Sequence, residues 1–300
     1  MNNVTELYCA IDDFCKWFIP LWEKKQLAEG DRERKAREGI MSASEMMTIL
    51  VLFHHSKQRH FKGFYTQYVP YVFGREFPKR VSYQRFVELA QCVMIPMTAY
   101  LHSRRVKSGG IAFIDSTPLK VCHNCRIKQH KTFANLAQRS KNSMGWYFGF
   151  KLHLIIDDTG ELISFFITAA NYDDRKGLKA MAQFIQGKLY GDKGYISKTL
   201  KAMLKSQQTD LITHTRKNMK KEALDEFDKA MLKKRSLIET VFNQLKNSCQ
   251  IEHSRHRSLL GFMVNVIAGL IAYTWQDKKP SLKLRMTPLF VKTVNLQLST

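Results

Sequence analysis

The sequence predicts a mixed α/β or α+β fold, because short apolar segments typical of strands alternate with longer segments of helical periodicity. Ile111–Ile114 is an apolar run between Gly110 and Pro118, as expected of a buried strand. Leu224–Ser248, by contrast, repeats its apolar residues at helical spacing. A chain of 300 residues that is 44% hydrophobic can bury a large core, which excludes a disordered basic tail.

The first third of the chain is predicted to be helical. Helices are expected over residues 5–18, where Pro20 ends the first helix, from Ser42 onward and after Ser82. Ser42 and Glu45 have the spacing of a capping box. Basic residues gather where the third helix starts: Lys79, Arg80 and Arg85. Residues 1–105 are therefore expected to form a helical region that binds DNA, with a merely solvated basic face as the alternative.

Strands and helices alternate from residue 111 onward. The expected strands are 111–115, 151–156, 161–169, 189–191 and 210–213, and the expected helices run to about 186 and over 197–205 and 224–248. Asp157 and Asp158 belong to a hairpin turn signal that ends at Gly160, so they are interpreted as turn residues. Asp173 or Asp174 is expected to cap the helix that follows.

One uncharged segment, Leu259–Trp275, raises the alternative of a membrane span. It is at the short limit for spanning a bilayer and contains Asn265 and Tyr273. A buried core helix is therefore the preferred interpretation, and no membrane partner is expected.

The net charge is +22, from 48 Lys and Arg against 26 Asp and Glu. Such an excess predicts a polyanionic partner, either nucleic acid or an anionic membrane surface, because contacts with phosphates release counterions. The six cysteines are scattered, which favours reduced thiols in a cytoplasm over a disulfide framework.

The basic residues are concentrated after Asp115. No acidic residue occurs between Asp115 and Asp157, whereas this segment carries Lys120, Arg126, Lys128, Lys131, Arg139, Lys141 and Lys151. A one-sided run of charge beside a carboxylate is interpreted as a track for DNA phosphates. Two further basic groups are candidates for phosphate contact: Arg216 with Lys217, and Arg255 with Arg257.

Three carboxylates are candidates for catalysis. Asp115 and Asp192 each follow a short apolar strand, and rigid backbone at the end of a strand is where open α/β sheets place their chemistry. Glu239 lies on the late helix, in a stripe with Arg235, Asn243 and Lys246 at steps of four, four and three residues. Each carboxylate alone has an ordinary interpretation, as a turn residue or as part of an exposed salt-bridged helix.

Together the three carboxylates suit a divalent metal site. Mg²⁺ prefers carboxylate oxygens, and two ions roughly 3.5–4 Å apart can activate a nucleophile and stabilise a leaving oxygen in phosphoryl transfer. Arg235 and Lys246 would then hold DNA phosphates.

The segments Ile-Asp-Ser-Thr-Pro at 114–118, Tyr-Gly-Asp-Lys-Gly-Tyr at 190–195 and Arg-x₃-Glu-x₆-Lys at 235–246 resemble the three catalytic motifs of DDE transposases of bacterial insertion sequences. The resemblance extends over about residues 42–273. It is closest to the insertion-sequence family numbered nine-eighty-two, including residues 121–124 and 251–257.

The resemblance implies an RNase H-like catalytic domain over 106–276, between the helical region 1–105 and a C-terminal tail 277–300. It implies that Asp115, Asp192 and Glu239 bind Mg²⁺ or Mn²⁺, with two ions, and that Arg235 and Lys246 contact DNA. The partners would be the terminal inverted repeats and target DNA, bound by a dimer or larger assembly in a bacterial cytoplasm, at the nucleoid. Leu232 stands where related transposases often have Tyr, so no tyrosine role is assigned.

Three alternatives stay open. Cys122 and Cys125, with His130 nearby, could form a zinc site, although a single Cys pair is a weak indication. The chain could be a non-catalytic DNA-binding protein derived from a transposase. It could also be a metal-dependent nuclease without strand transfer, because one metal site serves either water or a 3′-hydroxyl.

Overall fold

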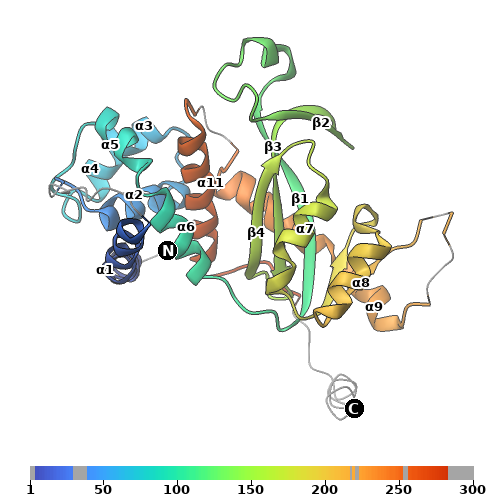
Figure 1. Ribbon diagram of the computed structural model, residues 1–300. Helices are drawn as coiled ribbons and strands as arrows, with labels where there is room; N and C mark the ends of the chain where they lie inside the picture. The colour runs from blue at the N-terminus through green and yellow to red at the C-terminus, as the bar shows by residue number, and fades with distance from the viewer. Residues whose placement is uncertain (1–3, 30–38, 217, 220–222, 253–255, 283–300) are drawn as a thin grey trace.

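The computed structural model describes residues 4–29, 39–216, 218–219, 223–252 and 256–282 (Figure 1). The first part of the chain is helical, as expected. Its elements are α1 (Val4–Ala28), α2 (Ala43–His55), α3 (Phe61–Gly63), a π-helical turn (Phe64–Tyr68), α4 (Val69–Val72), α5 (Tyr83–Ala90) and α6 (Met94–Ser103).

Local signals explain two of these helices and miss the length of a third. The capping box before α2 is confirmed, because Ser42 Oγ accepts from Glu45 N at 3.1 Å and Glu45 Oε2 accepts from Ser42 N at 2.7 Å. Ser82 Oγ caps α5 by accepting from Arg85 N. The prediction that Pro20 ends the first helix is wrong. Phe14, Phe18 and Trp22 stack at four-residue intervals, and this packing supports α1 across the proline.

The helices pack around α11 (Leu259–Thr274), which contacts both α2 and α6 (Figure 1). This is the uncharged segment, and its preferred interpretation as a buried core helix is confirmed. Its polar residues have partners: Asn265 Nδ2 donates to Ile251 O at 3.3 Å, and Tyr273 OH donates to Gly160 O at 2.6 Å. Among the described residues, no helix is long and apolar enough to cross a membrane.

A mixed sheet forms the second part of the molecule. Its strands are β1 (Gly110–Cys122), β2 (Gln138–Asn142), β3 (Gly145–Asp157), β4 (Leu162–Ala169), β5 (Gly187–Gly191) and β6 (Thr209–Thr213). β3 pairs antiparallel with β1, β2 and β4, whereas β1, β5 and β6 run parallel. The predicted α/β (α+β) fold is confirmed, with a mixed sheet and a helical N-terminal region.

Each face of the sheet is buried against helices. On one face, Ala112, Ile114 and Leu189 pack with Leu178 of α7 (Asp174–Met181) and Leu204 of α8 (Lys198–Ser206). On the other face, Phe113 belongs to the core that includes Ile238 and α11. Because successive strand residues point to opposite faces, this alternation fixes which way each side chain of β1 points.

The turn and cap predictions differ in outcome. Asp158 lies in the turn as predicted, whereas Asp157 is the last residue of β3. The Asp157 side chain still organises the turn, since its Oδ1 accepts from Thr159 N, Thr159 Oγ1 and Glu161 N. Asp173 is the N-cap of α7, and Asp174 is not. The helix that was expected to reach about residue 186 ends at Met181 and is followed by a 3₁₀ turn, Ala182–Phe184.

Two element boundaries near the expected site also differ from prediction. Asp115 does not end its strand, because antiparallel pairing with β3 carries β1 through Pro118 as far as Cys122. Beyond Phe113 the other edge of β1 has no partner in β5, so Pro118 occupies an edge position where its missing N–H costs little. The single helix predicted over 224–248 is divided at Arg235 into α9 (Glu226–Lys234) and α10 (Ser236–Asn243), followed by a π-helical turn, Gln244–Ser248.

Candidate active site

Asp115 and Asp192 are brought together by the parallel pairing of β1 with β5. Phe113 pairs with Tyr190 at the end of this ladder, and each aspartate follows two residues later on its own chain segment. Asp192 caps the short 3₁₀ helix Lys193–Tyr195, where its Oδ1 accepts from Lys193 N at 2.6 Å. The two carboxylates therefore project from the same edge of the sheet, where β5 stops and β1 continues.

Arg235 joins Glu239 to this pair. Its Nη1 donates to Asp115 Oδ2 at 2.7 Å, and its Nη2 donates to Glu239 Oε1 at 3.2 Å. The division between α9 and α10 falls at Arg235, whose carbonyl accepts a hydrogen bond from Ile238 N in a tight turn. The guanidinium thus bridges a carboxylate of the sheet and a carboxylate of the helix.

The electrostatics of the site follow from its partial burial. The side chains of Asp115 and Arg235 are 23% and 20% exposed. Burial raises the pKa of the Asp115 carboxyl, although Arg235 and the Ser116 N–H favour its charged form. Burial alone would lower the pKa of Arg235, but the carboxylates of Asp115, Asp192 and Glu239 outweigh it and raise that pKa. All three carboxylates therefore act on one cation.

This donor set suits a hard divalent cation, since it consists of carboxylate oxygens arranged around a positive charge. Asp115, Asp192 and Glu239 are the residues that would hold Mg²⁺ or Mn²⁺, and the Arg235 guanidinium stands where positive charge is favoured. In the part of the chain that the structure describes, no three His, Cys, Asp or Glu side chains are already close enough to hold a metal ion. The alternative zinc site receives no support either, although His123 Nδ1 lies 3.1 Å from Cys125 Sγ.

Asp174 is a fourth carboxylate near this edge that sequence reasoning did not single out. It accepts from Ser116 Oγ at 3.0 Å and from Lys151 Nζ at 3.1 Å. The hydroxyl of Tyr195 is buried without a hydrogen-bond partner, and burial together with the charges of Asp115, Asp174 and Asp192 raises its pKa. The consecutive Asp173-Asp174 was a signal, because only one of the two residues can be the N-cap.

The residues predicted to contact DNA occupy different environments. Lys246 is engaged within the protein: its Nζ donates to Pro118 O at 2.6 Å and lies 3.2 Å from Glu252 Oε2. Arg216 lies beside the acidic edge, since its Nη2 donates to Lys193 O at 3.3 Å. The remaining described candidates are exposed: Lys120, Arg126, Lys128, Lys131 and Arg257. Lys217 and Arg255 lie outside the described residues.

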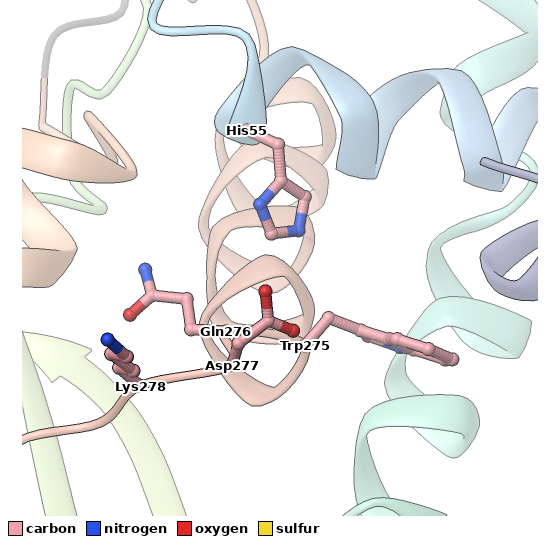
Figure 2. A pocket seen from close by; sticks show the side chains of 5 residues that line it. All are labelled: His55, Trp275, Gln276, Asp277 and Lys278. Atoms are coloured by element: carbon pink, nitrogen blue, oxygen red, sulfur yellow. The ribbon is translucent and has the colours of Figure 1, made fainter. Parts of the chain in front are cut away.

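A pocket of about 300 Å³ lies where α2 and α11 end (Figure 2). The residues that line it are distant in the sequence from the three carboxylates. Its lining residues are His55, Trp275, Gln276, Asp277 and Lys278. None of them is a predicted site residue, so the candidate active site is an open acidic edge rather than this pocket.

The fold and site define an α/β protein with an acidic centre where the parallel pairing of β1 with β5 ends. A family model described as "Transposase DDE domain" matches residues 105–259, which is just over half of the chain. The chain belongs to this transposase DDE domain family. The matched span contains Asp115, Asp192 and Glu239.

Similar solved structures are distant. A piggyBac transposase synaptic complex with hairpin DNA has 12% identity and a TM-score of 0.48, over 99% of this chain and 80% of that chain. The Mos1 strand transfer complex has 12% identity and a TM-score of 0.22, over 69% and 68%. The Mos1 mariner paired-end complex with Mn has 12% identity and a TM-score of 0.23, over 67% of each. No curated protein matches the chain.

Proposed function

We propose that this protein binds the terminal inverted repeats of a bacterial insertion sequence, cleaves the DNA at its ends and joins the freed 3′-hydroxyls to target DNA. The observation that carries the proposal is the convergence of Asp115 and Glu239 on one guanidinium, with Asp192 directly after the neighbouring strand β5. The family match supports a transposase, and the sequence resemblance supports the insertion-sequence family numbered nine-eighty-two.

Asp115, Asp192 and Glu239 hold Mg²⁺ or Mn²⁺ in this proposal. When bound, two such ions supply charge stabilisation for in-line displacement at phosphorus. The chain's own residues position the DNA. Arg235, at the centre of the site, is placed to hold a phosphate beside the scissile bond, and Arg216 is placed beside Asp192 to hold a neighbouring one. A dimer or larger assembly would bring two element ends together in a bacterial cytoplasm.

A positive net charge supplies the affinity for DNA. The charge of +22 favours duplex DNA independently of sequence, through counterion release. The exposed cations after Asp115 and on the loop before β2 provide the phosphate contacts of this proposal, including Lys120, Arg126, Lys128 and Lys131. Lys246, by contrast, would have to exchange its contacts with Glu252 and Pro118 for a phosphate.

The test is cleavage of a labelled duplex that carries the element's terminal repeat, with Mg²⁺ or with EDTA, by the wild type and by Glu239→Gln. The proposal requires metal-dependent nicking at the repeat boundary that Glu239→Gln abolishes. Addition of a target plasmid separates the alternatives: joined products indicate a transposase, whereas nicking without joining indicates a nuclease. DNA binding without nicking in any condition would indicate a non-catalytic DNA-binding protein.

A further inference from the structure

The β2–β3 ribbon carries Arg139 and Lys141 of the predicted phosphate track, and its exposed Trp146 has no role in the catalytic proposal. It extends at one end of the sheet, together with the loop before β2 (Figure 1). In the register of the two strands, Lys141 of β2 lies directly opposite Trp146 of β3, and Arg139 lies two residues before Lys141 on β2. Cross-strand partners and alternate residues share a face, so Arg139, Lys141 and Trp146 lie on the same face of the ribbon.

Trp146 is held in place but remains half exposed. Trp146 is 51% exposed, and the guanidinium of Arg139 lies 4.6 Å from the centroid of its ring. Lys141 Nζ lies 6.0 Å from the same centroid. Asn124 Nδ2 donates to Trp146 O at 2.7 Å, which fixes the short 3₁₀ helix Asn124–Gln129 beside the ribbon. Aromatic residues and arginine are both enriched in interfaces relative to the rest of a protein surface.

The charge around the ring identifies the chemistry of the partner. Arg126 and Lys128 are exposed on the 3₁₀ helix, Arg139 and Lys141 are exposed on β2, and no acidic residue occurs in the sequence from 116 to 156. An apolar protein surface would match the ring but not the cations, and an acidic peptide would match the cations but not the ring. Duplex DNA matches both parts, because it presents phosphates to the cations and sugars and base edges to the ring. A two-stranded β-ribbon also has the width that a DNA groove admits.

We propose that the β2–β3 ribbon is a second DNA contact, in which Arg139 and Lys141 hold phosphates and the Trp146 ring packs on the sugars and base edges between them. This inference rests on the proposed function, since it assumes that DNA is the partner. Asp115 pairs with Leu154, eight residues along β3 from Trp146, so Trp146 lies about 26 Å along the strand from the position of Asp115, at roughly 3.3 Å per residue. At 3.4 Å per base pair, the ribbon contacts the DNA arm about seven or eight base pairs from the scissile phosphate.

The test measures binding of a fluorescein-labelled 30-base-pair duplex by anisotropy at several salt concentrations. Trp146→Ala is expected to weaken binding about tenfold at every salt concentration and to leave the salt slope unchanged, because the slope depends on phosphate contacts and the ring packs on sugars and base edges. Arg139→Ala with Lys141→Ala is expected to lower the salt slope by about two, since each lost phosphate contact removes about 0.9. Trp146→Phe keeps an aromatic ring and is expected to restore most of the affinity.

Trp17→Ala is the matched control, because Trp17 is also exposed but lies on α1. It is expected to bind DNA as the wild type does. Wild-type affinity for Trp146→Ala, or an equal loss for Trp17→Ala, would overturn the inference. The cleavage assay reports on the proposed function separately: a Trp146-dependent affinity without any cleavage would contradict the catalytic proposal and leave the ribbon contact standing.

Discussion

Arg235 is the residue on which the geometry of the candidate site depends. It is partly buried between Asp115 and Glu239, so its loss leaves two carboxylates facing one another without their shared cation. We expect Arg235→Gln to lower the free energy of unfolding by about 1–3 kcal/mol at pH 7, as is usual when one partner of a partly buried ion pair is removed. Urea unfolding measures this loss.

The loss of stability in Arg235→Gln is expected to depend on pH through the Asp115 carboxyl. Without Arg235, the folded-state pKa of the Asp115 carboxyl rises further above its unfolded value. The destabilisation is therefore full at pH values above both pKa values and shrinks as acidification protonates Asp115. Lys234→Gln removes the same charge one position earlier, at an exposed site, and is expected to cost less than 0.5 kcal/mol. Equal losses for the two variants would show that the site contacts contribute nothing to stability.

At the scale of elements, sequence reasoning located the carboxylates but not the backbone that carries them. Short apolar runs before Asp115 and Asp192 predicted strands, and both exist. The continuation of β1 through Pro118 depends on pairing with β3, which is a tertiary contact that no local pattern reports. β2 was missed for the same reason, because Gln138–Asn142 is polar and forms a strand only by pairing with β3.

α7 is positioned by a glycine. A Cβ on Gly177 would lie 3.0 Å from Nδ1 of the buried His153 ring, so the missing side chain lets α7 approach β3 and bring Asp174 to Ser116. We expect Gly177→Ala to lower the free energy of unfolding by about 1–3 kcal/mol, since overpacking outweighs the higher helix propensity of alanine. Gly63→Ala in α3 is the control, because its Cβ would meet nothing within 4 Å. Thermal unfolding of the two variants tests this packing. A Gly177→Ala protein that is as stable as Gly63→Ala, or more stable, would contradict it.

The basic loop between β1 and β2 is the element that the sequence assigns to phosphates. Lys128 and Lys131 are both exposed on it. Lys128→Ala combined with Lys131→Ala is expected to weaken DNA binding to the same extent for unrelated sequences and to lower the salt slope by about two. Salt titrations with two duplexes of different sequence measure both effects. A loss confined to one sequence would indicate base recognition instead of a phosphate track.

The whole molecule is a helical part and a sheet part that share one core through α11. His54 of α2 is buried, and its Nδ1 contacts the carbonyl of Cys249, at the end of the π-helical turn after α10. The sequence predicted α11 as a core helix, but not that it would pack against α2 and α6. A contact between segments about 200 residues apart leaves no pattern in either one. The predicted boundaries of the three regions remain predictions.

Buried histidines make the stability of the whole molecule sensitive to pH. Burial lowers the pKa of His54, His55, His153 and His256 to about 4. The unfolded chain, with histidine pKa values near 6.5, therefore binds more protons between pH 6.5 and 4. The free energy of unfolding is expected to be highest above pH 6.5 and to fall on acidification, by about 1.4 kcal/mol per pH unit for each histidine. Urea titrations from pH 7 to pH 5 that show constant stability would contradict this burial.

The central claim is that Asp115, Asp192 and Glu239 together form one site for divalent metal ions. Fe²⁺ binds the same hard oxygen ligands as Mg²⁺ and, with ascorbate and peroxide, generates hydroxyl radicals that cut the nearest backbone. Mapping these cuts is the most direct measurement. We expect cleavage of the chain near residues 115, 192 and 239, suppressed by excess Mg²⁺ and lost in Asp192→Asn. Cuts elsewhere, such as near Cys122 and Cys125, or cuts that Mg²⁺ does not suppress, would contradict the claim.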